Sequence, residues 1–229
     1  PSISILKEEK SRKANQTNVF FYPKTLPLKD TLYAKLANFF LLRNVNEDSS
    51  INLRLAETSK DWKPRNIKAI EFKRPKGILL AELEDSFQVG NSHIGIVGEL
   101  FSARDPLEQK GKENRVGGLL VQDGNGTILD LTLFSHNSDI YASKFFGSVI
   151  LTGAYELIAK RMDQHVSEEI LLQSREGLNT KHDFYKKLAK VIDKWLEPYV
   201  EEEKQKTRRT SNFNEDASKR INRGLDVLN

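Results

Sequence analysis

Residues 115–134, RVGGLLVQDGNGTILDLTLF, form the clearest folding unit in this chain, with two apolar runs on either side of Asp123-Gly124-Asn125-Gly126. Asp-Gly and Asn-Gly pairs supply the positive φ angles that tight hairpin turns require. Gly117 and Gly118 leave room for another group to pack close on the first run. The second run alternates, with Leu129, Leu131 and Leu133 on one side and Ile128, Asp130 and Thr132 on the other. We therefore predict a central β-hairpin whose apolar side chains belong to the core.

The composition is typical of a globular protein with a charged surface. The 229 residues suit one large domain or two small ones, and 38% of them are hydrophobic and 30% charged. The chain has no cysteine, which excludes a disulfide framework and any cysteine-ligated metal site. This favours a reducing, cytoplasmic setting. No apolar run approaches the ~20 residues that span a bilayer, so we expect no membrane partner.

Before the hairpin, the pattern indicates short α/β elements. Residues 1–18 are polar without periodicity, so we expect a loop there. Apolar spacing predicts a helix between residues 31 and 45. Residues 60–75 contain Pro64 and Pro75, and we interpret them as a connector. Strands are predicted at residues 19–22, 51–55, 77–83 and 93–101, and a long charged loop at residues 103–114.

After the hairpin, helices predominate. We predict a short helix at residues 140–146, a strand at 148–152 and a helix at 154–165. From residue 182 the apolar residues step by three and four, and we expect Pro198 to kink or restart this helix because it lacks an amide donor. The acidic trio 201–203 would then begin a last helix, where negative charge suits the positive end of the dipole. Its narrow apolar stripe, which resembles one strand of a coiled coil or helical hairpin, is Phe213, Ala217, Ile221, Leu225 and Leu228.

Motifs for common enzyme chemistry are absent from the sequence. It contains no Walker A motif, no G-x-G-x-x-G that opens a helix after a strand, and no G-x-S-x-G elbow. The four histidines are scattered and lack the H-x3-H spacing of a metal site. We therefore assign no catalytic residue and no metal ligand.

Two polar clusters are candidate sites. The first surrounds Gly177 and consists of Arg175, Glu176, Asn179 and His182. It is either a ligand contact or, as we favour, a junction that pins helices, with His182-Asp183 at a helix N-terminus rather than acting as an acid–base pair. The second lies between residues 204 and 223, where seven basic residues and two acids give +5 in a chain of net charge +4, so the remainder sums to −1. It is either a solvated helix face or a nucleic-acid contact. Its basic residues are Lys204, Lys206, Arg208, Arg209, Lys219, Arg220 and Arg223.

Three strings together resemble a known family. They are NFFLLR at residues 38–43, the hairpin itself, and REGLNTKHDFYKKLAKVIDKWLEPYVEEE at residues 175–203. They resemble the region after the nucleotide-binding fold in prokaryotic proteins of the GHKL superfamily, the ATPases related to histidine kinases, gyrase and mismatch-repair proteins. The resemblance implies an α/β (α+β) fold with a mixed sheet and flanking helices. Its parts would be residues 1–60 as the end of a histidine-kinase-like ATPase domain, 65–166 as a transducer-like domain, and 167–229 as a helical C-terminal arm.

The resemblance implies a non-catalytic role in coupling and assembly. The family's magnesium-binding Asn, its Asp-x-Gly-x-Gly motif and its glycine-rich lid are not recognisable in this sequence. They would precede residue 1, so ATP and magnesium are expected only with an upstream domain, and we expect the chain to be part of a longer protein. A transducer-type lysine that reaches the nucleotide phosphate would be Lys110 or Lys112.

The expected partners are an upstream ATP-binding domain or a second copy of the chain, and DNA. The alternative is a stand-alone nucleic-acid-binding or scaffold protein that uses the basic helix.

Overall fold

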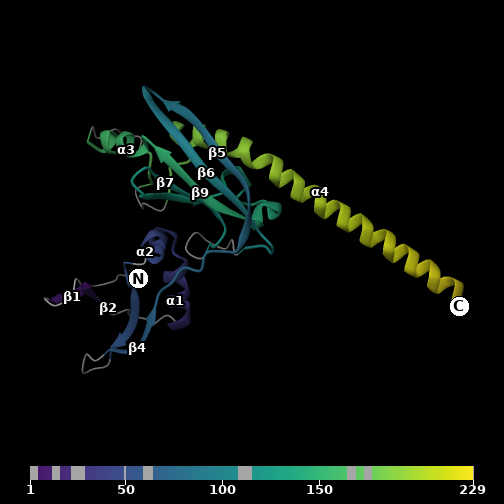
Figure 1. Ribbon diagram of the computed structural model, residues 1–229, viewed down its shortest axis with the longest axis horizontal. Helices are drawn as coiled ribbons and strands as arrows, with labels where there is room; N and C mark the ends of the chain where they lie inside the picture. The colour runs from purple at the N-terminus through teal and green to yellow at the C-terminus, as the bar shows by residue number, and fades with distance from the viewer. Residues whose placement is uncertain are drawn as a thin grey trace.

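The computed structural model describes the backbone of residues 5–11, 16–21, 29–48, 50–58, 64–107, 115–163, 169–172 and 177–228. It describes side chains in residues 32–48, 50–55, 68–107, 115–159, 169–172 and 177–208. Figure 1 shows a small N-terminal group of strands and helices, a larger sheet, and a long helix that packs beside the sheet and then extends away from it.

A mixed five-stranded sheet forms the main body, in the order β5-β6-β9-β7-β8. Neighbouring strands are antiparallel except β7 and β9, which run parallel. The mixed-sheet α+β fold predicted from the sequence is therefore confirmed. The strands are β5 (Gly77–Val89), β6 (Ser92–Ala103), β7 (Gly118–Asp123), β8 (Ile128–Thr132) and β9 (Phe145–Thr152).

The apolar residues of the β7–β8 hairpin do not share one side as predicted: Leu131 packs with Phe40 and Leu120, whereas Leu129 and Leu133 join the main core cluster, and the pairing register shifts within the hairpin. The hairpin itself forms as predicted, but it lies at the edge of the sheet and not at its centre. The reason is that β9 enters between β6 and β7 and pairs with both. The turn is held by Asp123 Oδ1, which accepts hydrogen bonds from the backbone of Asn125 and Thr127 at 2.9 and 2.8 Å. Gly118 has a φ of 100°, and a Cβ there would lie 3.1 Å from Arg115 Nε, so the group that packs close on this strand is the Arg115 side chain.

The core lies between the sheet and α4 (Asp183–Leu228). Phe184, Leu188, Ile192 and Leu196 of α4 are each fully buried, and their four-residue spacing places them on one side of the helix. They pack with buried residues of β6 and β9 in one cluster, which α3 (Ala154–Asp163) joins through Ala154 and Leu157.

α4 continues unbroken through Pro198, so the predicted restart of the helix there is wrong. Pro198 and Lys194 are both exposed. The Lys194 carbonyl, which Pro198 leaves without a helical donor, therefore lies at an exposed part of the helix where solvent is accessible. The acidic trio at residues 201–203 lies inside α4 and does not begin a helix.

The N-terminal part contains strands that the sequence pattern did not predict. β1 (Ile5–Ser11) pairs with β2 (Gln16–Phe21), so the expectation of a loop over residues 1–18 is wrong for the described residues. β4 (Pro64–Ala69) lies inside the predicted connector and pairs with β3 (Arg54–Thr58). The helical elements of this part are α1 (Lys29–Asn38), η1 (Phe40–Leu42) and α2 (Arg43–Glu47).

Two short 3-10 helices connect β8 to β9. They are η2 (Phe134–His136) and η3 (Ile140–Lys144). The predicted helix at residues 140–146 therefore ends at Lys144, because Phe145 begins β9. Residues 133–144, which we call the connecting segment, lie between the hairpin and α4.

Candidate functional site

Two buried arginines meet where the N-terminal part contacts the hairpin. Phe40 of η1 packs with Leu120 and Leu131, and this contact brings Arg43, at the start of α2, beside Arg115. Arg43 Nη2 donates a hydrogen bond to the Arg115 carbonyl oxygen at 2.6 Å. The two residues are 5% and 6% exposed. The N-terminal part is therefore joined to the hairpin by both apolar packing and a buried polar contact.

The electrostatics of this junction are unfavourable for two cations. The pKa of Arg43 is lowered to about 10, mainly by burial; the charge of Glu47 opposes this fall, and the nearby Arg115 adds to it. Burial also lowers the pKa of Arg115, and the negative charge of Asp130 opposes this fall. Among the residues described, Arg43 Nε and Arg115 Nε and Nη2 are buried without a hydrogen-bond partner. Buried donors without partners cost free energy, so the junction is held less tightly than its buried area alone suggests.

Asn137 links this junction to the connecting segment. Its Oδ1 accepts hydrogen bonds from Arg115 Nη1 at 2.6 Å and from the Leu133 backbone at 2.7 Å. Its Nδ2 donates to Thr132 Oγ1 at 2.8 Å. One side chain thus joins Arg115 to both the end of β8 and the residues that follow it.

The end of β8 carries a strained backbone. Phe134 has a φ of 53°, the left-handed region that bulky residues rarely occupy. Its backbone N–H donates to Thr132 Oγ1 at 2.9 Å, and its ring packs 5.5 Å from that of Tyr185 on α4. Such strain persists only where surrounding contacts hold it, and it often marks sites that move or bind.

Buried polar groups of β8 also reach the residues that lead into α4. Asp130 Oδ2 accepts a hydrogen bond from the Leu178 backbone at 3.0 Å. Burial raises the pKa of the Tyr185 hydroxyl, the charge of Asp130 raises it further, and a side-chain hydrogen bond with Thr132 opposes this rise. The polar side of β8, whose function the sequence left open, therefore serves to hold the start of α4.

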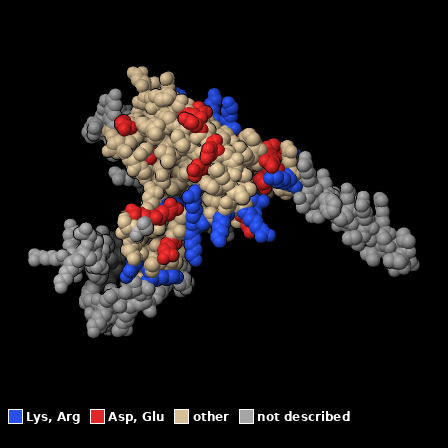
Figure 2. Space-filling view, viewed as in Figure 1, with Lys and Arg blue, Asp and Glu red and all other residues tan. Residues whose placement is uncertain are grey.

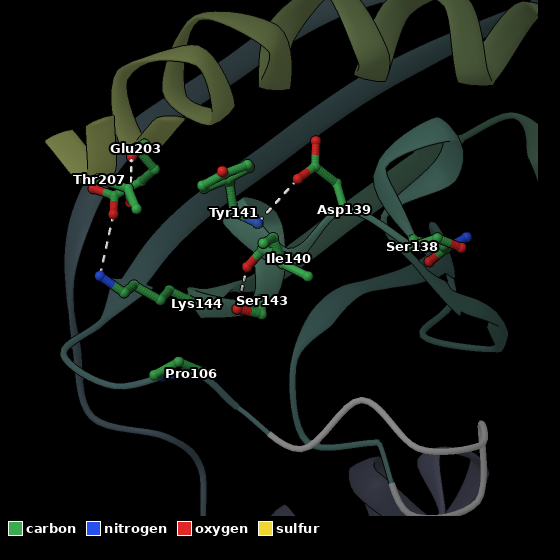
Figure 3. A pocket seen from close by; sticks show the side chains of 10 residues that line it. Pro106, Ser138, Asp139, Ile140, Tyr141, Ser143, Lys144, Glu203 and Thr207 are labelled. Carbon is green, nitrogen blue, oxygen red and sulfur yellow. Dashed lines mark hydrogen bonds and ion pairs between the residues drawn. The ribbon is translucent and has the colours of Figure 1, made fainter. Parts of the chain in front are cut away.

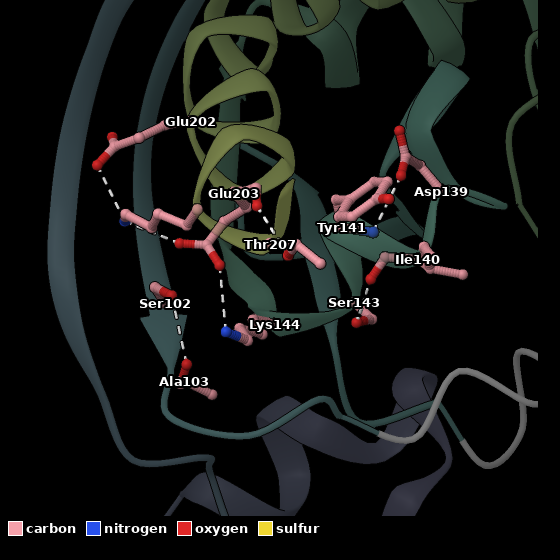
Figure 4. Close-up of polar contacts among 11 residues, drawn as sticks. Ser102, Ala103, Asp139, Ile140, Tyr141, Ser143, Lys144, Glu202, Glu203 and Thr207 are labelled. Carbon is pink, nitrogen blue, oxygen red and sulfur yellow. Dashed lines mark hydrogen bonds and ion pairs between the residues drawn. The ribbon is translucent and has the colours of Figure 1, made fainter. Parts of the chain in front are cut away.

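The connecting segment contacts α4 over several turns of the helix. These contacts come from both η2 and η3, and Figure 4 shows the part formed by η3 at the lower end of the packed region. These contacts are polar. Because polar contacts have preferred geometries, they fix the position of the connecting segment along α4 more specifically than apolar packing alone. The contacts are Ser135 N to Asp193 Oδ1 at 3.1 Å, Lys144 Nζ to Glu203 Oε2 at 3.1 Å and Lys204 Nζ to Asp139 Oδ2 at 3.4 Å. His136 Nε2 lies 3.4 Å from Glu197 Oε2 without a hydrogen bond between them.

A pocket lies between the connecting segment and α4, near the point where α4 leaves the sheet. Its volume is about 620 Å³. Figure 3 shows Tyr141, Ile140 and Lys144 on one side and Glu203 and Thr207 of α4 on the other. Ile140 is 73% exposed, a high value for a large apolar residue. Because the charged groups at its rim are already paired, the pocket suits an apolar group better than an ion.

In the described half of the predicted junction around Gly177, Asn179 and His182 make hydrogen bonds within the chain. Asn179 Nδ2 donates to the Glu169 carbonyl at 3.0 Å, and its Oδ1 accepts from the Lys181 backbone at 3.1 Å. His182 is buried, and its Nδ1 accepts from the Phe184 backbone at 3.0 Å, which caps the start of α4. Arg175 and Glu176 lie outside the described residues, as do the candidate phosphate contacts Lys110 and Lys112.

The candidate nucleic-acid residues differ in their surroundings. Lys204 pairs with Asp139 and Glu201, and Lys206 pairs with Glu202 and Glu203. Arg208 is exposed on α4. Figure 2 shows lysine and arginine side chains along the side of the sheet that faces the N-terminal part and below the start of the projecting helix. The side chains of Arg209, Lys219, Arg220 and Arg223 lie outside those described, although their backbone is part of α4.

The residues that sequence reasoning missed are Arg43, Arg115 and Asn137. Arg43 follows an apolar run and Arg115 precedes one, so each resembles an ordinary charged flank. Their partnership spans 72 residues and has no local pattern. Asn137 lies in a polar turn of a kind that usually faces solvent.

The described residues contain no group of three or more His, Asp or Glu residues arranged to hold a metal ion. None of their helices combines the length and apolar character needed to cross a membrane.

Comparison with known proteins returned no relative from which function could be transferred. No protein-family model matches the chain, and no curated protein matches its sequence.

Proposed function

We propose that this chain is the non-catalytic coupling and assembly part of a GHKL-type ATPase that acts in the cytoplasm. In this proposal the transducer-like sheet receives the state of an upstream nucleotide-binding domain through the N-terminal part. It passes that state to α4 through the connecting segment. The assignment to a GHKL-type ATPase rests on the family resemblance of the three sequence strings.

One observation carries the proposal: a series of polar contacts that, together with the backbone of residues 133–135, joins Arg43 to α4. Arg43 bonds to the Arg115 carbonyl, the Arg115 guanidinium bonds to Asn137, and Asn137 bonds to Leu133 and Thr132, which both precede the strained Phe134. Ser135, next in sequence, bonds to Asp193 of α4. Energetic coupling needs such contiguous contacts together with an element that has two arrangements. The incompletely bonded arginine pair and the strained backbone are candidates for that element.

The nucleotide part of the proposal predicts that this chain alone does not bind ATP tightly. The reason is that the residues which hold ATP and magnesium would belong to an upstream domain. Calorimetry with ATP and magnesium tests this, and micromolar binding would contradict it. The intact mass of the protein isolated from its natural source tests the upstream domain itself. We expect a nucleotide-binding domain ahead of residue 1, whereas a natural start at residue 1 would favour the alternative below.

Nucleic-acid binding by the basic part of α4 is the second candidate function. The observation that favours it is that this part of the helix extends away from the sheet (Figure 1). The pairing of Lys204 and Lys206 with neighbouring acids counts against those two residues. Full-length chain and a version that ends at Val200 would be compared for duplex DNA binding at two salt concentrations. Binding by phosphate contacts should depend on the arm and weaken steeply with salt, and binding that survives truncation or is absent would exclude this role.

A further inference from the structure

One face of α4 continues past the end of the sheet. At 3.6 residues per turn, each residue advances by about 100° around the helix. By this count Ile192, Leu196 and Val200, which are buried on the sheet, share a face with Glu203 and Thr207, which line the pocket. The same count places Phe213, Ala217, Ile221, Leu225 and Leu228 on that face.

By the same count, the apolar positions of the projecting part of α4 are on the helix face that farther back packs on the sheet. Figure 1 shows residues toward the C-terminal end of α4 extending clear of the other described elements. Most of the stability of a protein helix comes from packing of its apolar face, so an apolar stripe at this spacing ordinarily packs on another element. The apolar spacing also allowed a helical hairpin within one chain. The described residues do not form one, because α4 is one continuous helix.

The position of the sheet restricts how a second helix lies on this stripe. A copy of α4 placed parallel to the first would bring its own sheet-packed half, residues 184–200, into the space that the first sheet occupies. A copy placed antiparallel avoids this overlap, because only its projecting part runs alongside. In the antiparallel arrangement the far end of one helix approaches the base of the other, where the pocket lies.

The pocket and the end of α4 complement each other but cannot meet within one chain. Leu225 and Leu228 give the helix an apolar end, and the pocket offers the exposed Ile140 beside Tyr141. Thr207 and Leu228 belong to the same unbroken helix. At 1.5 Å per residue they are about 30 Å apart, so the helix end reaches only the pocket of another molecule.

We propose that two copies of this chain pair through antiparallel projecting parts of α4, each inserting its Leu225–Leu228 end into the other's pocket. The interface is then two-fold symmetric, with the same residues used twice, as is usual in homodimers. Most of the basic residues of the arm fall on the opposite face by the same count and stay outside the contact. This inference rests on the assembly half of the proposed function but not on its nucleotide half.

The first test is the mass of the full chain in solution, measured by light scattering over a range of concentrations. We expect twice the chain mass of 26.2 kDa. Leu225→Glu and Ile140→Glu should each weaken the dimer by about tenfold or more, since each places a charge in an apolar contact. The matched controls are Asn212→Glu, on the opposite face of α4, and Val97→Glu, at an exposed apolar position on β6. A monomer at all concentrations overturns the proposal, and so does a dimer that Leu225→Glu leaves unchanged while the melting temperature is also unchanged.

The second test uses the absence of cysteine from the chain. An Ile140→Cys protein is mixed with a Leu225→Cys protein under mild oxidation, and we expect a disulfide-linked pair to form. The control mixture replaces Leu225→Cys by Asn212→Cys. Cross-linking no faster than in the control would show that the helix end does not enter the pocket, and would overturn the proposal even if the chain is a dimer. Failure of these tests leaves the calorimetric and mass tests of the nucleotide-coupling proposal unaffected.

Discussion

At the scale of single residues, the contact between the N-terminal part and the hairpin depends on an apolar group beside a polar one. Leu131 is fully buried and packs with Phe40 and Leu120, while the two arginines lie close by with incomplete hydrogen bonding. Apolar burial contributes roughly 25 cal/mol per Å², whereas buried cations without full hydrogen bonding oppose the contact. We infer that the apolar contacts of Leu131 stabilise the junction and that the hydrogen bonds of the arginines fix its orientation.

Leu131→Asp should abolish stable folding of the hairpin and its junction. The carboxylate would be buried without a partner, and the lost apolar contacts alone cost about 2–5 kcal/mol by analogy with Leu→Ala substitutions. Thermal unfolding followed by circular dichroism measures the effect. Val97→Asp is the control, since Val97 is 51% exposed on β6 and should tolerate the change. An unchanged melting temperature for Leu131→Asp would mean that this side of β8 is not packed as described.

At the scale of elements, local pattern was enough for the hairpin, α3 and the first half of α4. It failed where the deciding contacts are distant. β9 pairs with β7 in parallel, and the local sequence of neither strand predicts this pairing. β1 has the sequence ILKEEKS. Its many charged residues do not predict a strand, and the strand is stabilised by pairing with β2. The same holds for the polar contacts: the helix start at His182-Asp183 was predicted, whereas the Arg43–Arg115–Asn137 contacts were not.

The attachment of α4 to η3 should depend on pH through Glu203. The pKa of Glu203 is lowered from 4.5, first by the hydrogen bond from Lys206 and also by that from Lys144. Because the folded pKa lies below the unfolded one, the contact stabilises the protein fully above pH 4.5 and is lost as pH falls through the folded pKa. The melting temperature of Glu203→Gln should therefore fall below that of the native chain near pH 7, and the two should converge in acid. Glu202→Gln, at a side chain that is 60% exposed, is the control and should show little difference at any pH.

Pro198 lies inside α4 and should cost stability there. It is exposed and removes one helical hydrogen bond. In a helix interior proline is about 3 kcal/mol less favourable than alanine, so Pro198→Ala should raise the melting temperature. Denaturant unfolding gives the size of the change. A lower stability for Pro198→Ala would show that a bend at this residue is needed for the helix to follow the sheet.

At the scale of the whole molecule, the arrangement places the junction and the projecting helix on opposite sides of the connecting segment. The hairpin contacts the N-terminal part on one side, and η2 and η3 contact α4 on the other. A change in how the N-terminal part contacts the hairpin can therefore be transmitted through the connecting segment to the start of the projecting part of α4. We propose that this route is used, so that disturbing one end loosens the other.

Hydrogen exchange in an Asn137→Ala chain tests that claim most directly. The substitution removes the side-chain bonds to Arg115, Leu133 and Thr132 without touching α4 itself. Ser102→Ala is the matched control, since the hydroxyl of Ser102 bonds only to the neighbouring Ala103 carbonyl among the described contacts. The account predicts faster amide exchange in Asn137→Ala both in residues 40–47 of the N-terminal part and in residues 193–204 of α4. Faster exchange confined to residues 133–144, with both ends unchanged, would contradict it.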